Sequence, residues 1–347
     1  MVKIYIFPDK DSYADALSAN SLLFPHIAKI EENDSFEYVD AHAVDRSNNP
    51  ELMDFCVAQG WAHESNDYLT HKEAWAVTTL GTLLQGNTSI KSFTELKYFI
   101  NVKELGTRNA FQGCTNLKVI DFRNIRSVAS YALAGSPAPV FEDLGTLEMC
   151  TGFSASTANL TRLKSFKIGK WFRGFTAGNS FSGSYAIDEI IVDSDNPVYL
   201  KGYNVLVNSA GNLLLGSNYP NLPDDGTIKV INNKAFFGAN SLQSLVLPEG
   251  VTTLGSNAFN TASKITLIDM PSTLTSIGSD CFRNCGQLVS ITCRATTPPA
   301  IPSSGTNTFT GINRNCKIYV PSSSVAAYKT ATIWSGQAGK IVAIPEE

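Results

Sequence analysis

The apolar positions of residues 88–345 recur in one short pattern, Leu-x-x-φ-x-φ, in which φ is apolar and x is mostly polar. The φ-x-φ part has a period of two, which predicts a short strand with both φ side chains directed inward and the middle side chain directed outward. The copies are Leu117/Ile120/Phe122, Leu144/Leu147/Met149, Leu163/Phe166/Ile168, Ile187/Ile190/Val192, Leu242/Leu245/Leu247, Ile265/Ile268/Met270 and Leu288/Ile291/Cys293. We therefore expect a row of short strands that share one inward face.

A second recurring feature is a Phe that follows a small residue and is itself followed, three positions later, by another small residue. We expect this ring to fill the space between successive layers. The Phe anchors are Phe111, Phe181, Phe236, Phe259 and Phe282. The interval from Leu242 to Ile265 is 23 residues, and the interval from Ile265 to Leu288 is the same. A period of about 20–30 residues is typical of a solenoid, in which each unit buries its apolar face on its neighbours.

These units resemble the BspA-like branch of the leucine-rich repeat proteins, whose repeats read roughly L-x-x-I-x-L-P-x-x-V-x-x-I-G-x-x-A-F-x-x-C. The resemblance implies a repeat solenoid that is curved, right-handed and mainly β, with short helical or 3-10 turns, used for binding rather than catalysis and common on bacterial surfaces. The expected parts are leucine-rich repeats over 88–315, irregular units over 129–180, a hairpin-bearing long unit over 193–230 and a C-terminal cap over 316–347.

The N-terminal region does not repeat. Residues 1–45 predict a small α/β segment of unknown family, with a strand in KIYIF, a helix over 11–30 that Pro25 interrupts, and a strand in FEYVDAHAV. A further helix is expected in NPELMDFCVAQG. Residues 46–87 resemble the helical lead-in of such repeats, which in relatives carries a loop like half of an EF-hand.

That loop is degenerate in this chain. Ala62 and Asp67 stand where a calcium loop needs Asp and Gly, so only Glu64, Asn66 and Glu73 remain as calcium candidates. The favoured interpretation is a helix-capping loop, and we expect no metal or cofactor.

The cysteines of CFRNC resemble a redox or metal pair, but the repeat register suggests another role. Cys281 stands where other units have Ala or Ser, and Cys285 stands where they have Ala, Ser or Cys. Free Cys behaves as a small hydrophobic residue in such positions. A zinc site would need a second pair of Cys or His ligands, which the sequence does not offer. We expect both cysteines to be buried packing residues.

An enzyme is not expected from these motifs. All four histidines precede the repeats, and the sequence contains no G-x-S-x-G. The enzymatic alternative places an active site in residues 1–60, around Asp40, His42 and Asp45, with the repeats as a targeting arm. No nucleophile motif accompanies these three residues.

Net charge and hydropathy limit the kinds of partner that the protein is expected to bind. A net charge of -4 and a pI of about 5.7 argue against nucleic acid, and no apolar run is long enough for membrane insertion. No signal peptide is visible, so the cell surface, a phage particle and the cytoplasm all stay open.

The favoured hypothesis is a non-enzymatic recognition or adhesion module that binds a protein or glycan through the solenoid face. A phage or prophage host-attachment component, with residues 1–45 as a joining segment, is the alternative; the oligomeric state is open. Candidate contacts are the outward strand positions Asp121, Glu148, Lys167, Ile191, Val246, Asp269 and Thr292, the flanking residues Lys118, Lys164, Asp188, Glu189 and Gln243, and the tyrosines Tyr199, Tyr203 and Tyr219.

Overall fold

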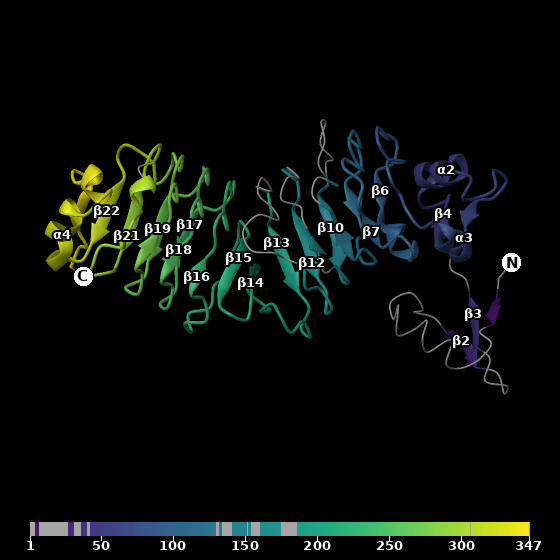
Figure 1. The fold of residues 1–347 in the computed structure, drawn as a ribbon, viewed down its shortest axis with the longest axis horizontal. Helices are drawn as coiled ribbons and strands as arrows, with labels where there is room; N and C mark the ends of the chain where they lie inside the picture. The colour runs from purple at the N-terminus through teal and green to yellow at the C-terminus, as the bar shows by residue number, and fades with distance from the viewer. Residues whose placement is uncertain are drawn as a thin grey trace.

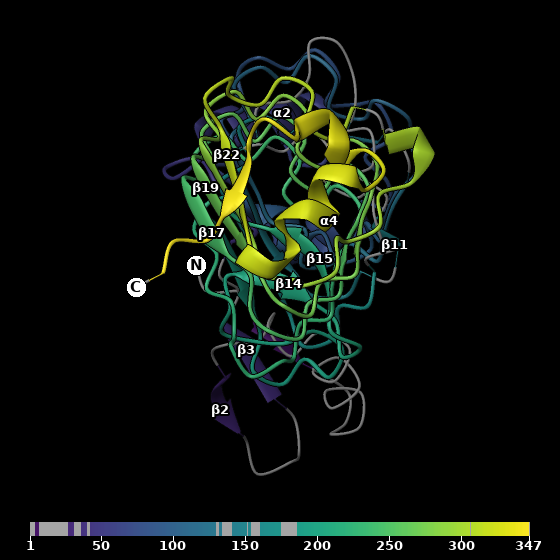
Figure 2. The same cartoon turned by 90° about the vertical axis from the view of Figure 1, so that its left-hand side faces the viewer.

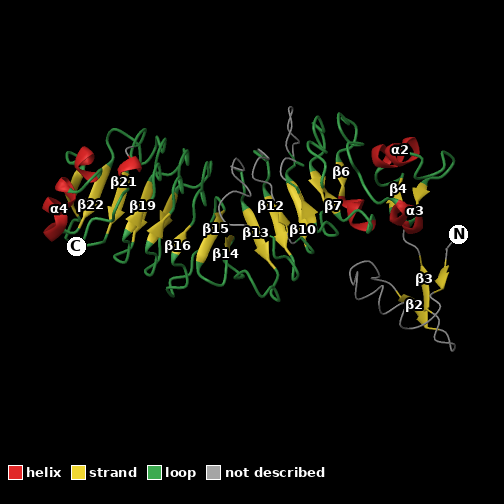
Figure 3. Ribbon diagram, in the orientation of Figure 1, coloured by secondary structure: helices red, strands yellow, loops and turns green. Residues whose placement is uncertain are grey.

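The computed structural model of the protein describes residues 4–6, 27–30, 36–39, 42–129, 132–133, 141–150, 152–153, 160–174, 186–305 and 307–346. Most of them form an elongated solenoid whose short strands lie side by side along its length, with helices near its two ends (Figures 1 and 3). Viewed from one end, the successive turns of the chain overlie one another (Figure 2). Among these residues, no helix has the length and apolar character needed to cross a membrane.

The Leu-x-x-φ-x-φ segments form two parallel sheets, which we call the ladder sheets. Parallel pairing brings the same position of successive units side by side, as in Leu245, Ile268 and Ile291. The first ladder sheet comprises β6 (Ser92–Phe93), β8 (Val119–Ile120), β10 (Asp143–Leu147), β12 (Ser165–Ile168) and β13 (Glu189–Val192). The second comprises β17 (Ser244–Val246), β19 (Leu267–Met270), β21 (Ser290–Cys293), β22 (Lys317–Val320) and β23 (Ile341–Ala343).

Other strands of the units, together with the strands of the long unit, form two further sheets. The first contains β7 (Glu104–Leu105), β9 (Ser127–Val128) and β11 (Gly152–Phe153). The second contains β14 (Val205–Val207), β15 (Asn212–Gly216), β16 (Val230–Ile231), β18 (Thr253–Leu254) and β20 (Ser276–Ile277). β14 and β15 are antiparallel and form a hairpin, whereas β15 pairs in parallel with β16.

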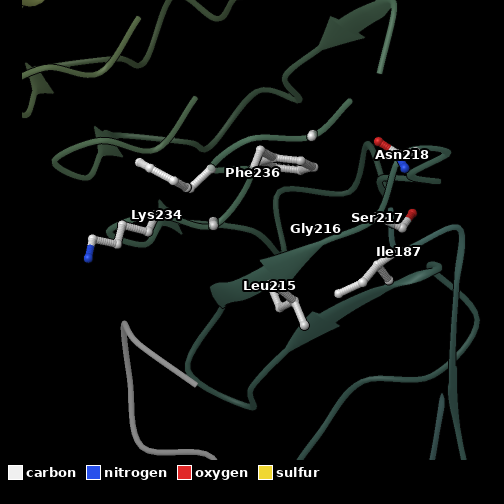
Figure 4. Close-up of a pocket in the computed structure, with 10 residues that line it drawn as sticks. Ile187, Leu215, Gly216, Ser217, Asn218, Lys234 and Phe236 are labelled. Carbon is white, nitrogen blue, oxygen red and sulfur yellow. The ribbon is translucent and has the colours of Figure 1, made fainter. Parts of the chain in front are cut away.

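The hairpin separates two hydrophobic cores. Leu206 packs into the core of the N-terminal units, while its neighbours Val205 and Val207 pack into the core of the C-terminal units. Because side chains alternate along a strand, a strand buried on both faces can divide one core from the next. Figure 4 shows the C-terminal side of this junction, where the Phe236 ring lies over Gly216. A Cβ at Gly216 would lie 2.0 Å from that ring, so only glycine fits there.

The core contains the predicted inward residues of the regular units. Phe111, Phe236, Phe259 and Phe282 are all buried, and Phe181 lies outside the described residues. Three of the anchor rings, Phe236, Phe259 and Phe282, form a stack that continues to Phe309, at successive centroid distances of 5.2, 5.7 and 6.1 Å.

One predicted repeat register is wrong. β10 carries a bulge, and Thr146 pairs with Lys167 while Leu147 pairs with Ile168. Leu144 and Leu147 therefore fill the two inward slots, and Met149 lies outside the strand and is half-buried. The bulge adds Gly145, whose φ of 62° suits glycine, and shifts the outward position from Glu148 to Thr146.

The ends of the solenoid differ from the repeats. The N-terminal side carries β4 (Val44–Asp45), β5 (Tyr68–Leu69), α2 (Pro50–Ala58), α3 (His71–Ala76) and the 3-10 helix η1 (Thr94–Tyr98). The C-terminal side carries η2 (Ser303–Gly305), η3 (Ser322–Ser324), α4 (Val325–Thr330) and η4 (Trp334–Gln337). Trp334 and Tyr328 are fully buried there, and their polar atoms donate to the carbonyls of Pro299 (2.9 Å) and Ala295 (2.8 Å).

The first residues form a small antiparallel sheet of β1 (Ile4–Ile6), β3 (Phe36–Val39) and β2 (Ile27–Ile30), in that order. The expected helix over 11–30 is wrong at its end, because residues 27–30 pair with β3 as a strand. The rest of that expected helix lies outside the described residues. The boundaries at 45, 87 and 315 stay predictions.

Candidate recognition surface

The outward side chains of the two ladder sheets form one candidate surface, which we call the ladder face. Val246, Asp269 and Thr292 are neighbours across β17, β19 and β21, as expected from the 23-residue period. Val246 is 65% exposed because β17 is the edge strand of its sheet. Asp269 is largely covered by Arg294, whose guanidinium donates to both of its carboxylate oxygens at 2.9 and 2.7 Å.

The N-terminal part of the ladder face contains a hollow of about 390 Å³, which we call the Arg123 hollow. It extends across the first ladder sheet from η1 to β13. Its charged lining residues are Lys97, Asp121, Arg123, Asp143, Lys167 and Glu189. Two of these, Asp121 and Lys167, are predicted ladder residues, and a third, Glu189, is a predicted flanking residue.

The bulge in β10 shapes this hollow. Gly145 lies so close to the neighbouring strand that a Cβ on it would stand 2.9 Å from the Cα of Asp121. Asp143 accepts a hydrogen bond of 2.8 Å from the Gly145 amide, which holds the bulge. Asp121 is consequently only 6% exposed, so the expectation that it projects into solvent is wrong.

Asp121 and Arg123 form a pair within the hollow. The Asp121 carboxylate accepts from the Arg123 amide at 3.0 Å and from its Nη2 at 3.1 Å. Burial raises the pKa of Asp121, although the Arg123 charge opposes the rise. The Nε of Arg123 is buried and has no hydrogen-bond partner among the described residues.

Other predicted contacts on this half take part in intramolecular interactions. Lys118 forms an ion pair of 3.5 Å with Glu142, and Asp188 accepts from the Asn218 side chain at 3.0 Å. Glu148 folds over Gly169 beside the hollow; burial raises its pKa, and the nearby charge of Asp193 adds to the rise. Lys164 is exposed.

The three tyrosines of the long unit do not form one patch. Tyr199 is 4% exposed and packs against Phe172 at a centroid distance of 5.9 Å, so its expected surface role is wrong. Tyr203 is partly buried against the C-terminal core. Tyr219 is 61% exposed and lies in a groove of about 500 Å³ that also contains the predicted residue Gln243. We call it the Tyr219 groove.

The calcium candidates have other roles or positions. Glu73 completes a capping box at α3, where its carboxylate accepts from the amide (2.8 Å) and hydroxyl (2.7 Å) of Thr70. Glu64 and Asn66 are on the loop before β5, and Arg46 pairs with the adjacent Asp67 at 3.5 Å. Within the described ranges, no group of three or more His, Cys, Asp or Glu residues is placed to hold a metal ion.

The CFRNC cysteines are both fully buried. Burial raises the pKa of Cys285 to about 12 and raises that of Cys281 as well. Because the thiolate is the reactive form, this environment suits a packing residue and not a redox or metal-binding pair.

The proposed enzymatic cluster is only partly described, because Asp40 lies outside the described residues. His42 stacks on Tyr68 at a centroid distance of 3.7 Å, and its Nδ1 lies 3.2 Å from Asp45 Oδ2. Hydrogen bonds from Ser47, followed by one from His42, lower the pKa of Asp45. An acid with a lowered pKa that is bonded to its own turn is a poor general base.

The stacked parallel strands, the buried Leu and Phe ladders and the 23-residue register define a leucine-rich repeat solenoid. The sequence matches the BspA type leucine-rich repeat region in six copies, over residues 86–198 and 218–331. The chain belongs to this family. The interval between the two matches, 199–217, contains the hairpin of β14 and β15.

Three solved structures illustrate the similarity. A leucine-rich repeat protein from Eubacterium ventriosum is 22% identical with a TM-score of 0.42, and the match covers 68% of this chain and 64% of that one. The pneumococcal vaccine antigen PcpA is 15% identical with a TM-score of 0.41, covering 75% and 78%. A leucine-rich cell surface protein from Faecalibacterium prausnitzii is 19% identical with a TM-score of 0.42, covering 70% and 57%. The chain thus spans less than two thirds of the first and third of these structures. No curated protein matches the chain.

Proposed function

We propose that the protein is a non-enzymatic recognition module that binds a protein partner through the ladder face, with the Arg123 hollow as the central contact. The observation that carries this proposal is the open Arg123 hollow itself, which extends across the first ladder sheet and is lined by Lys97, Arg123 and Lys167.

The charges of the hollow indicate what kind of acceptor fits. Asp121 and Asp143 are already hydrogen-bonded to Arg123 and to the Gly145 amide. The formal charges of the lining balance, with three cations against three acids. Arg123 is paired with Asp121, whereas Lys97 and Lys167 form no ion pair among the described residues. We infer that the partner presents a carboxylate, from an acidic side chain or a chain end, to this cluster.

The surroundings of the hollow favour a protein over a small ion. Ile191 pairs with Lys167 across the first ladder sheet, and its apolar side chain is 39% exposed. Protein interfaces combine such apolar contacts with a charged rim, and solenoids present extended faces of this kind. A role in host attachment by a phage stays a prediction.

A peptide selection tests the proposal. A random peptide library displayed on yeast would be selected against the full chain, and enriched peptides would be titrated by fluorescence anisotropy. We expect acidic peptides whose Kd rises by about tenfold or more in Lys167→Glu, equivalent to about 1.4 kcal/mol. Lys229→Glu, outside the hollow, is the matched charge control and should leave Kd unchanged.

Two results would overturn the proposal. One is a set of enriched peptides that carry no acidic residues. The other is binding that Lys167→Glu and Lys229→Glu weaken equally, since only net charge would then matter. Circular dichroism of each variant checks that the solenoid is intact.

A further inference from the structure

We propose that the Tyr219 groove is a saccharide-binding site, separate from the Arg123 hollow and independent of the function proposed for it. The groove lies beside β17 and β19, where the hairpin unit meets the regular repeats. Its lining combines one exposed aromatic ring with polar side chains: Tyr219, Asn240, Gln243, Lys264, Thr266 and Gln287.

The Tyr219 ring is exposed while its backbone is held firmly. Its amide donates to Ser217 Oγ at 3.2 Å, and its carbonyl accepts from the Asn204 side chain at 2.8 Å. The preceding residue, Asn218, is buried and joins both sides of the junction (Figure 4). Its amide donates to the Ile187 carbonyl at 2.7 Å, and its Oδ1 accepts from the Ser241 amide at 3.0 Å. Because the backbone of Tyr219 is held, only the side-chain torsions of the ring have to be ordered when a ligand packs on it.

The polar side chains come from consecutive units at matched positions. Thr266 follows Gln243 by one 23-residue period, and its amide and hydroxyl both donate to the Gln243 carbonyl, at 2.7 and 3.0 Å. Neighbouring strands lie about 4.8 Å apart, so these groups recur at a fixed interval along the groove. Such an arrangement suits an elongated ligand whose own hydrogen-bonding groups repeat.

The chemistry of the lining selects a hydroxyl-rich ligand. The side-chain amides of Gln243 and Gln287 offer both donors and acceptors, which matches sugar hydroxyls, and neither side chain has a hydrogen-bond partner in the described part of the chain. A Tyr ring has an apolar face and a polar tip, which suits the C–H face and the rim of a sugar ring. A protein partner would instead need an apolar centre, and the lining supplies no aliphatic side chain.

The charge of the groove lining indicates which saccharides should bind most tightly. Lys264 is the only charged residue of the lining, and no carboxylate accompanies it. The groove should therefore accept neutral oligosaccharides and prefer ones that carry a carboxylate near Lys264.

Calorimetric titration of the full chain with two hexasaccharides tests the proposal: neutral chitohexaose and acidic hexagalacturonate. We expect both to bind, hexagalacturonate more tightly. Tyr219→Ala should raise both Kd values by about tenfold or more, as loss of an aromatic anchor does, and Tyr219→Phe should stay within about threefold of wild type. Lys264→Gln should weaken only hexagalacturonate.

The controls separate this site from general effects and from the Arg123 hollow. Trp171 is 53% exposed on the N-terminal half, so Trp171→Ala removes an exposed aromatic ring outside the groove and should change neither Kd. Lys167→Glu should likewise leave sugar binding unchanged. If neither sugar binds wild type at millimolar concentration, or if Tyr219→Ala and Trp171→Ala behave alike, the proposal is wrong, whatever the peptide selection gives.

Discussion

The two halves of the solenoid use the same repeat with different regularity. In the C-terminal half the anchor rings Phe236, Phe259 and Phe282 stack with interplanar angles of 8° and 12°. In the N-terminal half the rings of Phe111 and Phe141 meet at 77°. The units of the C-terminal half keep a 23-residue period, so each anchor ring repeats the environment of the previous one. The units of the N-terminal half vary in length, and Phe111 packs edge to face against Phe141, which is not one of the anchors.

This difference bears on function because both candidate sites lie where the repeat is interrupted. The Arg123 hollow depends on the bulge at Gly145, and the Tyr219 groove lies where the hairpin unit joins the regular units. A uniform stack repeats the same spacing between units along its length. An insertion displaces a strand or a loop and leaves space that a ligand could occupy.

The largest expected effect concerns the ring stack. Phe259→Ala should lower the free energy of unfolding by about 3–5 kcal/mol, because it removes a buried ring. Phe111→Ala, equally buried in the N-terminal half, should cause a similar loss, since burial and not stacking order sets most of the cost. Urea unfolding followed by both circular dichroism and Trp fluorescence measures the two losses.

Lys167→Ala is the surface control and should cost less than about 0.5 kcal/mol. A small loss in Phe259→Ala, equal to that of Lys167→Ala, would contradict the position of Phe259 in the core. A much smaller loss in Phe111→Ala than in Phe259→Ala would show that the irregular half relaxes around a cavity.

Substitution of a glycine between units should have an intermediate effect on stability, and the effect should differ between the two halves. A Cβ at Gly278 would stand 2.4 Å from the backbone nitrogen of Ser256, in the preceding unit. Gly278→Ala should therefore cost about 1–3 kcal/mol by overpacking. Gly106 follows β7 in an N-terminal unit as Gly278 follows β20. A Cβ at Gly106 would have no atom within 4 Å, and the next unit already carries Ala129 at this position. Gly106→Ala should be nearly neutral in the same urea titration; equal losses would show that contact between units does not set the requirement for glycine.

The smallest expected effect is on the pH dependence of the free energy of unfolding, to which one carboxylate in each half contributes with opposite sign. The folded protein keeps Asp121 protonated to higher pH than the unfolded chain does, because burial raises its pKa above 3.8. Above that pH the folded state binds more protons, so this residue lowers the free energy of unfolding as pH rises. Asp121→Asn should remove that decline.

Glu249 in the C-terminal half has the opposite sign. Hydrogen bonds from Ser272 lower its pKa below 4.5, so its contribution is present above that pH and is lost as pH falls through the lowered value. Glu249→Gln should therefore lose stability at neutral pH relative to wild type and converge with it in acid. Urea unfolding from about pH 3 to pH 7 measures both variants, and slopes of the same sign would contradict the assigned environments.

The regular half was largely predictable from the sequence because its period is constant. Once Leu242, Ile265 and Leu288 are aligned, the alternation within each strand assigns every inward residue, and the same register places Cys281 and Cys285 in small buried slots. The family follows from the same pattern. Where the period changes, this reasoning fails. Alternation that starts from Leu144 predicts an inward Met149, and nothing in the local sequence distinguishes that register from the bulged one.

The candidate sites were only partly predictable for a related reason. Asp121 and Lys167 could be assigned to one face from alternation, but the burial of Asp121 depends on the close approach of Gly145 from the next strand. Gln243 and Tyr219 were each predicted separately, from different patterns. Their proximity depends on the hydrogen bonds of Asn218, which no periodicity encodes. Tyr199 was expected at the surface, but Phe172 covers it.

By itself, the sequence determined that this chain is a leucine-rich repeat solenoid, which residues fill its core and that its paired cysteines are packing residues. These are local properties, since the spacing of apolar residues dictates which side chains a strand buries. Only the tertiary structure decided where the surface is hollowed and which polar groups lack partners. Those properties depend on distances between units, and a bulge or an inserted hairpin changes these distances without changing the pattern of any single unit.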